Sequence, residues 1–162
     1  LIITNEKTME NEEIYLMSTK GVWFVNYSIP KFSPNMEKIV FALGMQMERD
    51  KPADTDIYIL DVGTRAFEKF IDDPVYNDDF PAYSPDGKFV AYYIFRFTNA
   101  RIERGVIVTR SNKSCQWRLP FGGNFDWSPD STKLVISADD GVYIVDLPEY
   151  LGESFVNGVG CP

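Results

Sequence analysis

The sequence predicts an all-β fold built from four-stranded antiparallel sheets that repeat as the blades of a β-propeller. One pattern occurs three times: an aromatic residue, then Ser-Pro, a polar turn that includes Lys, and an apolar run of β-prone residues. The copies span residues 29–42, 80–93 and 125–137. Their serines, Ser33, Ser84 and Ser128, are 51 and 44 residues apart, and repeats of that length are typical of propeller blades. The apolar residues follow a period close to the two residues of a strand, and helical periodicity is almost absent.

Each Ser-Pro turn is predicted to join the first strand of a blade to the second. Proline fixes φ at a value that suits a β-turn and has no N–H to donate, so the first strand should end there. Asp86-Gly87 in the middle copy can adopt the left-handed conformations that tight turns need. Lys38 and Lys133 lie four residues after the proline and Lys88 lies three after it, which predicts turns that differ in length by one residue.

The repeat divides the chain into about four blades, of which the first and last are incomplete. The predicted units are a partial blade at residues 1–26, blades at 27–71 and 80–119, a partial blade at 124–147 and a C-terminal tail at 148–162. In the first unit we expect strands at residues 1–4, 14–17 and 22–25. Residues 148–151 are expected to form one short helical turn at most. Because an open arc of blades exposes sheet edges, we expect the chain to be part of a larger ring.

Charge and composition exclude several classes of function. The net charge is −8, from 24 acidic and 16 basic residues, which disfavours nucleic acid and anionic membranes as partners. No run of eighteen apolar residues is present, so we expect no membrane span. The chain has no histidine, which excludes a Ser-His-Asp triad and a histidine zinc site within it. We therefore predict no catalytic residues and no cofactor. Cys115 and Cys161 could form a disulfide or remain free.

The repeat resembles that of TolB-type propellers, whose WD-like signature is an aromatic residue followed by Ser-Pro-Asp-Gly-Lys. Residues 83–88, Tyr-Ser-Pro-Asp-Gly-Lys, carry this signature, and Ile57-Tyr58 and Tyr143-Ile144 lie in strands that resemble the family's Ile-Tyr strand. The resemblance extends over nearly the whole chain up to residue 147. It implies a propeller that binds a partner, located in the periplasm or outside the cell. The same family includes the propellers of prolyl-oligopeptidase-like enzymes and many surface proteins.

The function expected is that of a non-enzymatic scaffold that binds a protein, a peptide or another ligand. In such propellers the links between blades and the loops between the second and third strands gather on one face. Here these stretches are residues 45–55, 72–79, 98–104 and 122–124, which are polar and do not repeat. The predicted partner-binding residues are Met45, Met47, Tyr76, Asp78, Asp79, Arg101 and Arg104. The methionines would offer adaptable apolar surface and the arginines directional hydrogen-bond donors.

Two alternative functions stay open. The chain could be the non-catalytic gating propeller of a prolyl-oligopeptidase-like serine peptidase, whose Gly-x-Ser-x-Gly motif and histidine would lie in a separate hydrolase domain. It could also be a carbohydrate-binding surface protein, with an exposed aromatic ring such as Tyr76 stacked on a sugar. Two carboxylates at a suitable separation can hydrolyse glycosides, and the candidates are Asp78, Asp79, Asp139 and Asp140. We interpret these residues instead as acidic loop residues that keep the surface soluble and cap turns. The aromatic residues that precede the three turns, Phe32, Tyr83 and Trp127, are expected to form core between blades.

Overall fold

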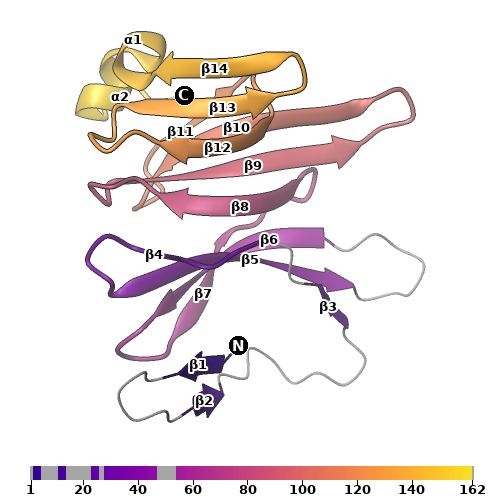
Figure 1. Cartoon of the computed structure of the whole chain (residues 1–162), viewed down its shortest axis with the longest axis vertical. Helices are drawn as coiled ribbons and strands as arrows, with labels where there is room; N and C mark the ends of the chain where they lie inside the picture. Colours follow the sequence, from indigo (N-terminus) through magenta and orange to yellow (C-terminus); the bar gives the residue numbers. More distant parts are fainter. Residues whose placement is uncertain (1, 5–10, 14–22, 26–27, 47–53, 162) are drawn as a thin grey trace.

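The computed structural model describes residues 2–4, 11–13, 23–25, 28–46 and 54–161, and these form a stack of antiparallel sheets (Figure 1). The all-β fold expected from the sequence is confirmed. A two-stranded sheet of β1 (Ile2–Thr4) and β2 (Asn11–Glu13) lies at the N-terminal end of the stack. The strand predicted at residues 14–17 lies outside the described residues.

The next two sheets are the complete blades, called blade two and blade three. Blade two consists of β4 (Lys31–Phe32), β5 (Lys38–Gln46), β6 (Asp54–Asp61) and β7 (Phe67–Ile71). Blade three consists of β8 (Asn77–Tyr83), β9 (Phe89–Phe97), β10 (Ile102–Arg110) and β11 (Gln116–Leu119). Strand β3 (Trp23–Val25) also pairs with β5, beyond the end of β4. It therefore extends blade two, whereas the sequence assigned it to the preceding unit.

Blade four has three strands in the described part of the chain. These are β12 (Gly123–Trp127), β13 (Lys133–Ala138) and β14 (Gly141–Asp146), and each pairs with the next. The chain then forms two short helices, α1 (Leu147–Leu151) and α2 (Glu153–Asn157), in place of a fourth strand. The short helical turn expected at residues 148–151 corresponds to α1, which the Asp146 side chain caps by accepting the backbone N–H of Glu149, whereas α2 was not expected.

The three Ser-Pro turns have one geometry. In each, the serine Oγ accepts the N–H of the residue five positions later, namely Lys38, Phe89 or Lys133, at 2.9–3.0 Å. The same hydroxyl donates to the side chain of Asn35, Asp86 or Asp130 at 2.6–2.7 Å. The third residue after the serine, Met36, Gly87 or Ser131, has φ between 60° and 73°. The turns are therefore equal in length, and the predicted difference of one residue is wrong: Lys88 occupies the turn position that precedes the strand.

Apolar side chains fill the spaces between successive blades. Between blades two and three, Val40 and Ile59 pack with Val90, Tyr92 and Ile107. Between blades three and four, a second cluster joins Ala91, Val106, Val108, Trp117, Trp127, Leu134, Ile136 and Val145. Burial of this apolar surface is the main force that holds the stack together.

The aromatic residues before the turns have unequal environments. Trp127 is buried, Tyr83 is half-buried, and Phe32 is 54% exposed, so the expectation of core packing is wrong for Phe32. All three nevertheless line one hollow where the first strands of the blades come together. Phe32 is the most exposed of the three, and its strand has only two residues.

The C-terminal segment is attached to blade three. The ring of Phe155 on α2 stacks on Phe89 with centroids 4.5 Å apart, and Trp117 Nε1 donates to Ser154 Oγ at 3.1 Å. A disulfide joins Cys115, which precedes β11, to Cys161, with Cα atoms 5.4 Å apart. No helix in the described part of the chain is long and apolar enough to span a membrane.

Candidate functional site

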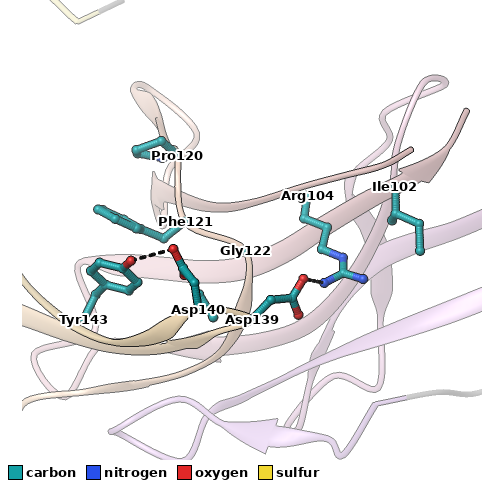
Figure 2. Close-up of a pocket in the computed structure, with 9 residues that line it drawn as sticks. Ile102, Arg104, Pro120, Phe121, Gly122, Asp139, Asp140 and Tyr143 are labelled. Atoms are coloured by element: carbon teal, nitrogen blue, oxygen red, sulfur yellow. Dashed lines mark hydrogen bonds and ion pairs between the residues drawn. The ribbon is translucent and has the colours of Figure 1, made fainter. Parts of the chain in front are cut away.

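A groove of about 600 Å³ lies on the face of the stack where the blade links and the β13–β14 turn meet (Figure 2). It is lined by Ile102, Arg104, Pro120, Phe121, Gly122, Ala138, Asp139, Asp140 and Tyr143. These residues come from β10, from the link between blades three and four, and from β13, β14 and the turn that joins them. The groove is thus formed by two neighbouring blades. Loops held on a rigid scaffold, as here, commonly carry recognition.

Charged groups occupy one side of the groove. Arg104 Nη1 on β10 donates to Asp139 Oδ2 in the β13–β14 turn, which forms an ion pair between the two blades. The side chain of Asp139 is largely exposed, so this pair is available to solvent and contributes little to stability. Gly122 allows the link to pass beside the arginine, because a Cβ at this position would overlap Arg104.

Aromatic groups occupy the other side. The rings of Phe121 and Tyr143 pack together with centroids 4.5 Å apart. The Tyr143 hydroxyl donates to Asp140 Oδ2 at 2.9 Å, and this hydrogen bond to a carboxylate raises the pKa of Tyr143. Figure 2 shows the two hydrogen-bonded pairs side by side, with the Phe121 ring next to Tyr143.

An aromatic ladder on the β9–β10 hairpin continues the groove. Phe95 is the cross-strand partner of Arg104, and Phe97 is the partner of Ile102, so these side chains share one face of the sheet. Along β9, the rings of Tyr93 and Phe95 stack with centroids 5.7 Å apart, and those of Phe95 and Phe97 meet edge to face at 5.8 Å. Phe97 is 72% exposed. The hairpin extends beyond blade four in Figure 1, so the end of the ladder is uncovered.

Of the predicted partner-binding residues that the structure describes, only Arg104 lies in this groove. Tyr76 and Arg101 lie on the opposite face of the hairpin, where both contact Glu103. The Tyr76 hydroxyl donates to Glu103 Oε2 at 3.0 Å, and Arg101 Nη2 is 3.6 Å from Oε1. Two arginines also contact the Tyr76 ring: Arg96 and Arg118, at 4.9 and 4.8 Å from its centroid. The predicted loop at residues 98–104 is a turn of residues 98–101, which is why Arg104 is fixed on a strand.

Asp78 and Asp79 were expected in an exposed loop, and this expectation is wrong. Both lie on β8, where they pair with Ile94 and Tyr93 of β9, and both are buried. The two carboxylate oxygens of Asp78 have no hydrogen-bond partner, and burial raises the pKa of this group to about 8. Burial also raises the pKa of Asp79, whose Oδ1 accepts the N–H of Phe80 at 2.8 Å. Neither side chain is available to a partner on the surface.

Of the two predicted methionines, the structure describes the backbone of one. Met45 belongs to β5 and pairs with Asp54, so it is not in the loop where it was expected. Met47 lies outside the described residues. Among the residues that the structure describes, no three acidic or cysteine side chains are arranged to hold a metal ion.

Phe121, Tyr143 and Ile102 were missed as site residues by sequence reasoning. Phe121 was placed in a link and Tyr143 in a strand, and nothing in the repeat indicated that they meet. The available signal was positional: Pro120-Phe121-Gly122 connects two blades, and Asp139-Asp140 joins two strands on the same face. Combining these two observations would have placed Arg104, Asp139 and Phe121 together.

Solved structures with the same arrangement of sheets decide the architecture. The propeller domain of the Trilobed protease from Pyrococcus furiosus matches 80% of this chain with a TM-score of 0.57 and 20% sequence identity. The chain has a β-propeller fold. Hydrazine synthase from Kuenenia stuttgartiensis matches 93% of the chain with a TM-score of 0.60 and 15% identity.

The propeller chain spans less than half the length of these two structures. It covers 47% of the hydrazine synthase chain and 40% of the protease propeller. At these levels of identity the likeness concerns the fold alone. No family model matches the sequence, and no curated protein matches it.

Proposed function

We propose that this propeller binds a partner protein and that the groove between blades three and four receives an extended segment of that partner. The observation that carries the proposal is the convergence of the exposed aromatic ladder with Arg104, Asp139 and Phe121 on one concave surface. Aromatic and arginine side chains at the centre of a concave surface are the residues that most often dominate binding free energy at protein interfaces.

The chemistry of the groove specifies the partner segment. Phe97 and Ile102 offer an apolar surface for an aliphatic or aromatic side chain. Asp139 and Asp140 next to it would pair with a lysine or arginine, and the overall charge of −8 favours approach of a basic segment. The proposed ligand is therefore a peptide with an apolar anchor beside a basic residue.

We propose that the role of this chain is binding and not catalysis. We also propose that the chain is related to TolB-type propellers. The Cys115–Cys161 disulfide supports a location in the periplasm or outside the cell, because disulfides persist in oxidising compartments. The alternative role as a peptidase propeller is supported at the level of fold by the likeness to the protease propeller. A carbohydrate ligand is less favoured, since Phe121 and Tyr143 each use one ring face to pack on the other.

Selection of peptides from a random displayed library on the immobilised protein tests the proposal. We expect enriched sequences that combine an aromatic or aliphatic residue with a neighbouring Lys or Arg. Their affinity, measured by calorimetry, should fall at least tenfold, about 1.4 kcal/mol, in Arg104→Ala and in Phe97→Ala. Arg101→Ala is the matched control, because this exposed arginine lies on the other face of the same hairpin.

Two results would contradict the proposal. One is a set of peptides that bind both groove variants as tightly as the unaltered protein. The other is an absence of enriched peptides together with binding on a glycan array that Phe97→Ala abolishes, which would favour the carbohydrate alternative.

A further inference from the structure

The outer edge of β14 is the place where a fourth strand would pair in blade four. In blades two and three this place is filled, because β7 pairs with β6 and β11 pairs with β10. In the part of the chain that the structure describes, the strand order of blade four ends at β14. The residues that follow form α1 and α2 beyond the end of β14 (Figure 1), and a disulfide joins Cys161 to Cys115 next to β11. The segment that supplies the fourth strand in the other blades is therefore engaged elsewhere.

Backbone hydrogen-bonding groups point outwards from this edge. Leu147, which follows β14, donates its N–H to the carbonyl of Thr132, which precedes β13, at 2.8 Å. Because the direction of these groups alternates along an antiparallel strand, the N–H and C=O groups of Val142, Ile144 and Asp146 point away from β13. This row is called the open edge. Among the described residues, no other strand pairs with it.

The open edge corresponds to the edge that the fourth strand uses in the other two blades. Asp61 ends β6 and Arg110 ends β10, as Asp146 ends β14. The N–H groups of the first two donate to the carbonyls of Ala66 and Cys115, immediately before the fourth strands, at 2.8 and 2.9 Å. A sheet edge with unpaired N–H and C=O groups is a template for pairing with a strand of another chain.

A groove of about 440 Å³ runs along the open edge. It is lined by the four consecutive β14 residues from Tyr143 to Asp146, and by Phe121, Glu149 and Tyr150. Because successive side chains of a strand point to opposite faces, a lining of consecutive residues places the groove at the edge of the sheet. The Phe121 ring lies 4.5 Å from that of Tyr143 and 6.5 Å from that of Tyr150, between centroids, so aromatic rings form one wall of the groove.

Building on the function proposed above, we propose that the extended segment of the partner protein adds to β14 as the fourth strand of blade four. It runs antiparallel to β14, as β7 and β11 do to their neighbours. Phe121 and Tyr143 line both this groove and the groove between blades three and four, so one segment can occupy both. Asp140 and Glu149, which are exposed and lie beyond the two ends of β14, complement a basic segment.

Hydrogen exchange of the backbone amides, followed by NMR, tests first whether the open edge is free in the protein alone. The matched amide is that of Val108, which lies two residues before Arg110 and pairs with β11, as Ile144 lies two residues before Asp146. We expect the N–H of Ile144 to exchange at least about a hundredfold faster than that of Val108. Slow exchange at Ile144 would show that another part of the chain already pairs with β14. That result would overturn strand addition and leave the groove between blades three and four as the proposed site.

The second test uses the most enriched peptide of the display selection as the probe. Its addition should slow exchange at Ile144. The variant Ile144→Pro removes the outward N–H, and an edge strand tolerates proline where its N–H faces solvent, so the variant should fold, which circular dichroism and thermal melting check. Ile144→Ala is the matched control, because it removes the exposed side chain and keeps the N–H. The peptide should bind the proline variant at least about tenfold more weakly than the alanine variant.

Methylation of the peptide nitrogens one at a time gives the same information without a change to the protein. Binding should be lost at alternate residues, whose N–H groups face β14, and kept at the residues between them. Peptides that require Arg104 and Phe97 but bind Ile144→Pro and Ile144→Ala equally, or tolerate every methylation, would overturn strand addition alone. A selection that enriches no peptide would overturn both this proposal and the proposed function.

Discussion

At the scale of single residues, Asp78 has the least usual environment in the described part of the chain. It lies between blades two and three without a hydrogen-bond partner. Its pKa of about 8 results first from loss of hydration and then from the nearby charges of Asp73 and Asp56. The carboxyl group is therefore protonated in the folded protein at neutral pH, whereas in the unfolded chain it is ionised. Folding at neutral pH consequently requires uptake of a proton at this site.

We predict that Asp78 makes the protein less stable as the pH rises. A carboxyl group whose pKa is higher in the folded state gives full stability below its unfolded pKa of 3.8, and this stability is lost progressively up to about pH 8. The slope should be at most about 1.4 kcal/mol per pH unit. Asp78→Asn cannot ionise, so urea denaturation at pH 5, 7 and 9 should show a weaker pH dependence and greater stability at pH 9.

The control for this prediction is Asp126→Asn, which removes the same charge from an exposed residue of β12. It should leave the pH dependence as it is in the unaltered protein. If Asp78→Asn and the unaltered protein lose stability in parallel between pH 5 and 9, the group is not protonated in the folded state.

At the scale of elements, the Ser-Pro turn is the unit that repeats most closely. In all three copies the third residue after the serine, Met36, Gly87 or Ser131, has a left-handed backbone conformation, yet only one of the three is a glycine. A residue with a Cβ in this conformation costs roughly 1 kcal/mol. Ser131 compensates, because its Oγ accepts the N–H of Asp86 at 3.0 Å and so links two turns. Met36, by contrast, is 65% exposed.

Replacement of these residues by glycine should therefore have unequal effects. Met36→Gly should raise the free energy of unfolding by about 0.5–1 kcal/mol, since it removes the strain of a side chain at positive φ. Ser131→Gly should be neutral or destabilising, because it also removes the hydrogen bond to Asp86. Chemical denaturation of the two variants measures the difference. Destabilisation by Met36→Gly would show that the flexibility of the unfolded chain outweighs the strain.

The repeat explains how much of the fold could be predicted from the sequence. The second and third strands of each blade carry period-two patterns bounded by turn residues, and those signals are local. Asp78 and Asp79 were assigned to a loop because aspartate disfavours strands, but nine-residue β9 extends the pairing of β8 to Asn77. The groove could be predicted only in part. Arg104 was identified from its charge, whereas the meeting of Phe121 with Tyr143 depends on how two blades pack.

At the scale of the whole molecule, the C-terminal segment completes the core that blade four leaves open. Blade four contributes Trp127, which stacks on Phe89 of blade three, and Phe155 packs on both Phe89 and Trp117. Arg110 Nη2 donates to the Phe155 carbonyl at 2.8 Å. The helices are only five residues each, too short to be stable alone, so their position depends on these contacts and on the disulfide.

We therefore predict that the Cys115–Cys161 disulfide contributes strongly to stability. It closes a loop with a sequence separation of 46 residues, for which the loss of chain entropy in the unfolded state amounts to about 4 kcal/mol. Urea denaturation with and without a reductant measures the free energy of unfolding of the two forms, and we expect the two values to differ by at most this amount. A double variant, Cys115→Ser with Cys161→Ser, should resemble the reduced protein and should not respond to the reductant.

Because blade four and α2 share one core with blade three, loss of the disulfide should lower the midpoint of a single unfolding transition. A separate early transition, with the rest of the molecule unaffected, would instead mean that the C-terminal segment folds independently of the blades.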